Sequence, residues 1–319
     1  MPSMFKLAVA VLGAAVALAG AGTASAQTYG LATMAPGTLA HTAASAIAKV
    51  LKEKAGLNTL VQPTAGESVL IPMVAKGEID FGVANMLEVV DGIETGRLQN
   101  DLRVIGSIYV LRIGFFSRKD SGIVSVADLK GKRFPAGYSA MRTLDRISLA
   151  MLATAGLTLA DVKPVMVPNV IRGADDFLAG ANDTFMFSFG GPKVREADAS
   201  VGGVRALAIV DTPQGLEASR KVFPYGYFVE VKPGPVYVGV DKPMKAYSMD
   251  YILFTNAKTK DDVVGKIIDT MLKHKPDLVA VAPVLADLTP ELIHRKHGIS
   301  YHPGALKYFA DNNIAATAY

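Results

Sequence analysis

The stretch Met34-Ala35-Pro36-Gly37-Thr38 follows an apolar run and precedes a segment, 38–54, whose apolar residues recur with helical spacing. Gly56 stands where such a helix should end. A second stretch, Arg133-Phe134-Pro135-Ala136-Gly137, has the same arrangement, with Gly156 at the end of its helix. The spacing from turn glycine to end glycine is 19 residues in both copies (56−37 and 156−137). The chain therefore contains a strand–turn–helix unit twice.

The repetition continues beyond these helices. In each copy a further strand and a short helix lead to a Gly-x-x-Asp junction and then to a third strand. The junction is formed by Gly77 and Asp80 in the first copy and by Gly180 and Asp183 in the second. Two strand–turn–helix–strand–helix–strand units predict an α/β fold with two doubly wound lobes.

Extended segments connect the two copies. They run at 104–117 and again between 224 and 255, and they predict two extended crossovers that act as a hinge. We expect lobe I to comprise 27–112 and 236–319, and lobe II to comprise 113–235. The last part of the chain, from residue 261, should form helices that pack on lobe I.

The N-terminus has the pattern of an export signal. Lys6 precedes an apolar run, Leu7–Ala19, that is too short to span a bilayer. Ala24-Ser25-Ala26 fits a signal-peptidase site, so 1–26 is a predicted signal peptide and the mature chain should begin near Gln27. These features predict export to the periplasm and a mature chain of 293 residues, enough for two lobes with separate cores.

The composition excludes several classes of function. The chain has no cysteine, which excludes disulfides, thiolate metal sites and a cysteine nucleophile. Its net charge of +4 is spread along the sequence without a basic block, so we expect no nucleic-acid partner.

Candidate binding residues lie where strands run into helices. In open α/β sheets, ligands bind at the carboxyl ends of strands, and the helix N-termini there favour anions. Two such lobes facing each other predict a cleft for a small organic anion. The candidate ligand-binding residues are Thr33, Met34, Gly37, Thr38, Ser68, Asn85, Arg112, Tyr138, Ser139, Arg142, Phe187 and Ser188.

Several candidates also have a purely structural interpretation, and for Asn85 it is that of a turn residue. Thr38 and Ser68 either cap helices or contact the ligand. Arg142 either clamps a carboxylate, which its planar guanidinium suits, or is a solvated helix residue. Arg112, inside an apolar crossover, either pairs with an acidic neighbour or faces the ligand. Phe187 forms a wall of the cleft or belongs to the core.

No catalytic or metal motif is recognisable. His294, His297 and His302 lie close in sequence but lack a carboxylate at a spacing typical of metal ligands. The chain has no nucleophile elbow, phosphate-binding loop or dinucleotide fingerprint. We therefore expect no enzyme activity, no metal and no cofactor.

Several runs resemble the TAXI family of solute-binding proteins of TRAP transporters. They are Ala35-Pro36-Gly37-Thr38, Gly66-Glu67-Ser68, Gly77-Glu78-Ile79-Asp80 and Val126-Ala127-Asp128-Leu129-Lys130-Gly131-Lys132-Arg133. The resemblance implies a type II periplasmic binding fold and delivery of a small carboxylate, such as glutamate or 2-oxoglutarate, to a TRAP membrane permease. The chain departs from the family at Thr38-Leu39-Ala40-His41, where many members have tyrosines.

Three alternatives stay open. The chain is the substrate-binding component of an ABC importer, or a periplasmic enzyme on the same fold, or a ligand sensor for a signalling receptor. The main hypothesis is a monomeric periplasmic carboxylate-binding protein.

Overall fold

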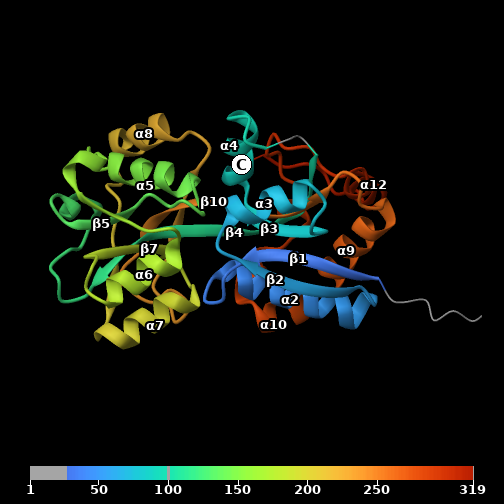
Figure 1. Cartoon of the computed structure of the whole chain (residues 1–319), viewed down its shortest axis with the longest axis horizontal. Helices are drawn as coiled ribbons and strands as arrows, with labels where there is room; N and C mark the ends of the chain where they lie inside the picture. Colours follow the sequence, from blue (N-terminus) through green and yellow to red (C-terminus); the bar gives the residue numbers. More distant parts are fainter. Residues whose placement is uncertain (1–26, 99–100, 319) are drawn as a thin grey trace, which may run out of the picture.

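The computed structural model describes residues 27–98 and 101–318, and the predicted signal peptide lies outside them. The first βα repeat builds one lobe, in blue and cyan in Figure 1. Its elements are β1 (Thr28–Met34), α2 (Leu39–Ala55), β2 (Asn58–Thr64), α3 (Glu67–Ala75), β3 (Phe81–Asn85) and α4 (Met86–Glu94).

The long strand β4 (Leu102–Arg118) leads into the second lobe, in green and yellow in Figure 1. The elements that follow are η1 (Val126–Leu129), β5 (Arg133–Ala136), α5 (Thr143–Ala153), η2 (Leu159–Asp161), β6 (Lys163–Met166), α6 (Val170–Leu178), β7 (Thr184–Ser188), α7 (Pro192–Val201), β8 (Val204–Ala206), α8 (Pro213–Val222) and β9 (Tyr227–Val231).

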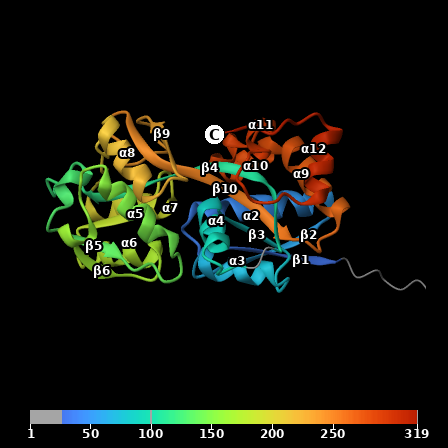
Figure 2. The ribbon, with the colours of Figure 1, turned by 90° about the horizontal axis from the view of Figure 1, so that it is seen from above.

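A second long strand, β10 (Met244–Asn256), returns to the first lobe, and Figure 2 shows it running through both lobes. The C-terminal elements are α9 (Asp261–Lys273), α10 (Lys275–Val281), η3 (Pro283–Asp287), α11 (Pro290–Ile293) and α12 (Pro303–Asp311). Helices α9 and α10 pack against α2 of the first lobe. Among the described residues, no helix combines the length and apolar composition that a membrane span requires.

The main sheet has the order β2-β1-β3-β10-β4-β7, with β8 added to β4 and β9 added to β10. Strands β1, β2 and β3 are parallel, whereas β10 is antiparallel to β3, β4 and β9. Residues 251–255 of β10 pair with the first lobe and residues 244–248 with the second. The predicted crossovers are therefore two hydrogen-bonded strands that carry one sheet through both lobes. Because both strands are continuous, the predicted lobe boundaries at 112 and 235 stay a prediction.

The sequence repeat has a direct structural counterpart. Gly37 and Gly137 have φ of 90° and 74°, and the end glycines Gly56 and Gly156 have φ of 66° and 69°. All four lie in the left-handed region, where glycine is favoured.

The junction aspartates are equivalent as well. Asp80 Oδ2 accepts a hydrogen bond from the Gly30 amide, and Asp183 Oδ2 accepts one from the Arg133 amide, both at 2.8 Å. In each lobe this carboxylate ties the start of the third strand to the start of the first. The predicted α/β fold with two doubly wound lobes is confirmed.

Candidate functional site

A cavity lies between the two lobes. The first lobe and the crossover strands line it with Met34, Thr38, Leu39, Ala40, Glu67, Asn85, Tyr109, Leu111, Ile113 and Tyr251. The second lobe contributes Met141, Leu144, Val170, Phe187 and Ser188. We call this space the central cavity. Its lining comes mainly from the carboxyl ends of strands and from the helix starts that follow them.

Five predicted residues lie in this lining, namely Met34, Thr38, Asn85, Phe187 and Ser188. Two of them also cap helices. Thr38 Oγ1 accepts from the His41 amide at 3.1 Å, at the start of α2. Asn85 Oδ1 accepts from the Glu88 amide at 2.9 Å, at the start of α4. The side-chain oxygens of Thr38 and Asn85, which we predicted as ligand contacts, therefore also cap helices.

The other candidates lie outside this lining. Thr33 and Tyr138 are buried, and Ser139 is exposed. The Arg112 guanidinium donates to Asp287 at 2.9 Å and lines a separate cavity with Arg195 and Tyr237. Pairing with an acidic neighbour was one of its two predicted roles.

Gly37, Ser68 and Arg142 lie where the two lobes touch. The Ser68 amide donates to the Ala140 carbonyl at 3.1 Å, and the Arg142 amide donates to Ser68 Oγ at 3.0 Å. On the other side of the cavity, the Lys193 amide donates to the Gly37 carbonyl at 3.2 Å. These contacts close the lobes over the central cavity. The clamp role predicted for the exposed Arg142 side chain stays a prediction.

Carboxylates of α4 reinforce this contact. Glu88 accepts from the Thr143 amide at 2.9 Å, at the start of α5, and from the Ser68 hydroxyl. Asp91 pairs with Arg146 of the second lobe and with Arg97. The sequence suggested that amides at the start of α5 bind an anion. In the structure they donate instead to side-chain oxygens of the first lobe.

Glu67, which is not among the residues predicted from the sequence, is the main polar group of the central cavity. Its side chain is 1% exposed. It accepts from the Asn85 amide at 3.0 Å, from the Asn85 side-chain amide, and from the Tyr251 hydroxyl at 2.6 Å. Burial raises the pKa of Glu67 from 4.5 to about 7, the hydrogen bonds oppose the rise, and repulsion from Glu88 adds to it.

Two tyrosines from the crossover strands stand beside this carboxyl group. Tyr109 of β4 and Tyr251 of β10 stack with ring centroids 4.8 Å apart and an interplanar angle of 9°. Burial and the nearby Glu67 raise the pKa of Tyr109, so its hydroxyl keeps its proton. Tyr109 is 0% exposed, and no hydrogen-bond partner for its hydroxyl exists among the described residues.

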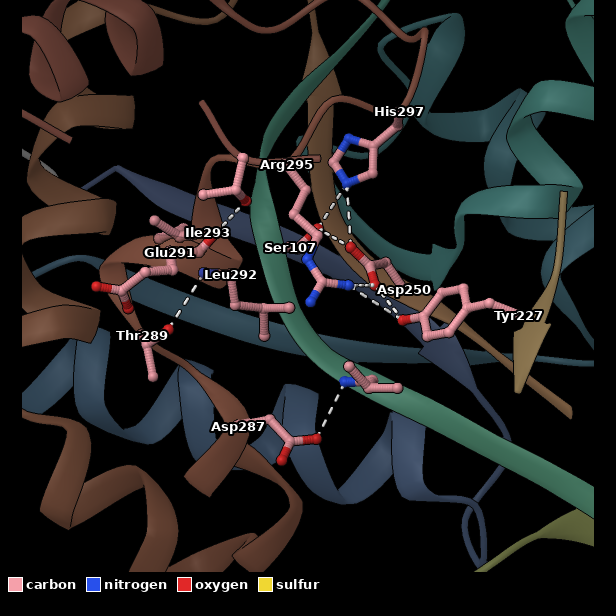
Figure 3. Close-up of polar contacts among 12 residues, drawn as sticks. Ser107, Tyr227, Asp250, Asp287, Thr289, Glu291, Leu292, Ile293, Arg295 and His297 are labelled. Carbon is pink, nitrogen blue, oxygen red and sulfur yellow. Dashed lines mark hydrogen bonds and ion pairs between the residues drawn. The ribbon is translucent and has the colours of Figure 1, made fainter. Parts of the chain in front are cut away.

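A second polar cluster, drawn in Figure 3, joins Ser107, Asp250 and His297. Ser107 Oγ lies 2.9 Å from Asp250 Oδ2 and 2.6 Å from His297 Nε2. Tyr227 and Arg295 bind the other oxygen of Asp250 at 2.7 Å and 2.8 Å. In a catalytic triad the histidine separates serine from aspartate, whereas here Asp250 contacts both. Ser107 and Asp250 are also fully buried, so the cluster ties the C-terminal segment to the crossover strands.

The other two C-terminal histidines have structural contacts. His294 stacks on Phe309 at 4.3 Å, and its Nδ1 lies 2.9 Å from the Ile314 carbonyl oxygen. His302 Nδ1 accepts from the Gly304 amide at 3.1 Å, at the start of α12. Both side chains hold the C-terminal helices in place.

The two lobes, the two crossover strands and the cavity between the lobes define the type II periplasmic binding fold. A structure described as a periplasmic transporter matches with a TM-score of 0.60 and 14% identity, over 81% of this chain and 87% of that chain. The alkanesulfonate-binding protein SsuA from Xanthomonas axonopodis pv. citri, bound to MOPS, matches at 0.50 and 14%, over 92% and 98%. The amino acid ABC transporter substrate-binding protein AbpA from Streptococcus pneumoniae, bound to L-arginine, matches at 0.50 and 12%, over 82% and 95%.

The model of one protein family matches residues 31–312 of this chain. The chain belongs to the NMT1-like family. The predicted membership of the TAXI family is therefore wrong, and so is the TRAP permease that it implied as partner.

The structure gives a physical reason for this error. Asp80 and Asp128, in two of the runs that suggested TAXI, accept hydrogen bonds from strand and turn amides. Gly77 and Gly131 hold left-handed turns. These two runs stabilise turns and strands and lie outside the lining of the central cavity, so they do not distinguish families that share the fold.

Proposed function

We propose that the protein is an exported solute-binding protein that encloses one small organic molecule in the central cavity and releases it to a membrane importer. The observation that carries this proposal is the construction of the cavity. Both lobes line it, and direct hydrogen bonds between the lobes lie on two sides of it. A molecule in this space is held by both lobes at once, so binding and lobe closure are coupled.

Of the importer classes left open by the sequence, we favour the ABC type. AbpA, one of the structural neighbours, is described as the substrate-binding protein of an ABC transporter. The neighbours also bind different solutes, L-arginine in one case and MOPS in the other. The fold therefore does not define the charge of the solute, and the side chains of the cavity must.

Gly66 allows a direct test of lobe closure. A Cβ atom here would lie 2.2 Å from the Ala140 carbonyl oxygen and 2.7 Å from Met141 Cγ, both in the second lobe. Its φ of 168° is extended and suits any residue. Gly66→Ala should therefore leave the first lobe intact and oppose closure. A clash of this kind costs about 1–3 kcal/mol, which lowers the apparent affinity roughly tenfold or more.

The experiment starts with a thermal-shift screen of amino acids, amines, sulfonates and carboxylates. Affinity for each solute found is then measured by calorimetry, and compaction by small-angle X-ray scattering. Gly265→Ala is the matched control, because its Cβ would come no closer than 4.0 Å to any atom outside its own helix. Solute should compact the control protein and not Gly66→Ala. Equal affinity and equal compaction in both variants would refute closure over the cavity. A solute recovered chemically altered would favour the enzyme alternative.

A further inference from the structure

The charge of the central cavity is unusual for a site expected to hold an anion. Its described lining contains one carboxyl group, Glu67, and no lysine, arginine or histidine. Three guanidinium groups near the lobe contact are paired with carboxylates, Arg112 with Asp287, and Arg97 and Arg146 with Asp91. The Arg142 side chain is exposed and lies outside the lining. An anion in this space would therefore meet a carboxyl group and find no counter-charge in the described lining.

The Glu67 carboxyl group has hydrogen-bond donors but no cationic partner among the described residues. A buried carboxylate without a counter-ion is strongly disfavoured, and a cation at short distance removes most of that penalty. Glu88 repels the Glu67 charge, and Asn85 and Tyr251 supply only neutral donors. The remaining titratable group beside it is Tyr109, whose hydroxyl is protonated.

A second, independent observation comes from Tyr109. The Tyr109 side chain lines the cavity, and its hydroxyl is buried without a described partner, which is costly unless a ligand atom or a water molecule pairs with it. The paired rings of Tyr109 and Tyr251 also line the cavity, and aromatic rings attract cations. Met34 and Met141 add polarisable thioethers. The remaining lining is largely aliphatic and suits an apolar body.

We propose that the central cavity selects a small organic cation, with an ammonium group at Glu67 and Tyr109 and an apolar body against the aliphatic lining. This inference rests on the proposed solute-binding function and adds the charge class of the solute. It replaces the expectation of a carboxylate, which becomes an outcome of the test.

The test uses sets of probes that differ only in the charged or polar group. Each of three carbon skeletons, benzyl, cyclohexyl and isobutyl, is tested as the ammonium, the alcohol and the carboxylate. Binding is measured by thermal shift and calorimetry on the purified protein. We expect at least one ammonium to bind, its alcohol to bind more weakly and its carboxylate not at all. Binding of carboxylates in preference to ammoniums overturns the charge assignment while leaving the solute-binding function in place. Binding of no ammonium at millimolar concentration also overturns it.

Variants link the preference to Glu67. Glu67→Gln should weaken ammonium binding about a hundredfold or more, because it removes one partner of a buried ion pair. The control is Glu53→Gln on the exposed face of α2, which removes the same charge far from the cavity. Ammonium affinity unchanged in Glu67→Gln would refute the assignment.

A proton count provides a readout that requires no variant. Near pH 7 about half of the Glu67 groups are protonated, since the pKa is about 7. A bound cation lowers this pKa and releases up to about half a proton, whereas a bound anion raises it and takes protons up. Calorimetry in buffers of different ionisation enthalpy gives the sign. Proton uptake on binding an ammonium would contradict the proposed contact.

Discussion

The buried Glu67 carboxyl group should make the stability of the solute-free protein depend on pH in a defined window. Its pKa is 4.5 when solvated and about 7 in the folded protein. The native state therefore binds more protons than the unfolded state between these values. The resulting stabilisation is fully present below about pH 4.5 and is lost as the pH rises through about 7. A rise of this size corresponds to about 3 kcal/mol.

Glu67→Gln isolates this contribution because glutamine does not titrate. The Asn85 side-chain amide, which donates to Glu67, would then face a second donor, so we expect a pH-independent loss of about 1 kcal/mol. Asn85 cannot simply rotate its amide, because its oxygen caps α4. The variant should thus be slightly less stable than the wild type at pH 4.5, about equal to it near pH 5, and about 2 kcal/mol more stable at pH 8.

The assay is urea unfolding of wild type and variant at several values between pH 4.5 and 8.5, without solute. The difference between the two free energies of unfolding should change by about 3 kcal/mol across the window, and half of that change should be complete near pH 6, about midway between the pKa values of the unfolded and folded states. Glu53→Gln should show no such change. A flat difference for Glu67→Gln would show that Glu67 does not titrate in this range and would refute the reasoning.

Two further substitutions probe the lobe contact and the core separately. Arg146→Gln removes the ion pair with Asp91 across the lobes, and should weaken solute binding about twofold to tenfold with little loss of stability, as calorimetry and urea unfolding would show. An equally large loss of stability would mean that the pair holds the fold and not the closed state. Gly82→Ala should destabilise the first lobe by about 1–3 kcal/mol in urea, because its Cβ would lie 2.6 Å from the Phe254 ring. Unchanged stability would show that the ring can move.

The fold could be predicted because its determinants are local. The turn glycines Gly37 and Gly137 adopt a left-handed backbone conformation in the structure. Positions with this conformation favour glycine, so they can be recognised in the sequence. Asp80 and Asp183 tie equivalent strands, so the same residue recurs at the same place in each copy. Repetition of short-range chemistry is visible without coordinates.

The site was only partly predictable. The ends of strands could be located, and this placed Asn85 and Ser188 in the cavity lining. Glu67 lies in one of the runs that resemble the TAXI family, but nothing local in the sequence marks it as buried. Its donors come from Asn85, 18 positions away, and Tyr251, 184 positions away. Recognition of a buried carboxyl group required the packing of three distant segments.

The charge of the solute shows why the fold cannot replace the site as an argument. The anion hypothesis used the partial positive charge of helix N-termini, worth roughly 0.3–1 kcal/mol each at exposed sites. In the closed protein, Glu88 and Ser68 already accept hydrogen bonds from amides at the start of α5. The partial positive charge of this helix end therefore stabilises the contact between the lobes and not a bound solute. One buried carboxylate without a counter-ion outweighs such a term several-fold. Because Glu67 is that carboxylate and lies in the lining, the sign of its charge, and not the helix dipoles, should decide which solutes the closed lobes retain.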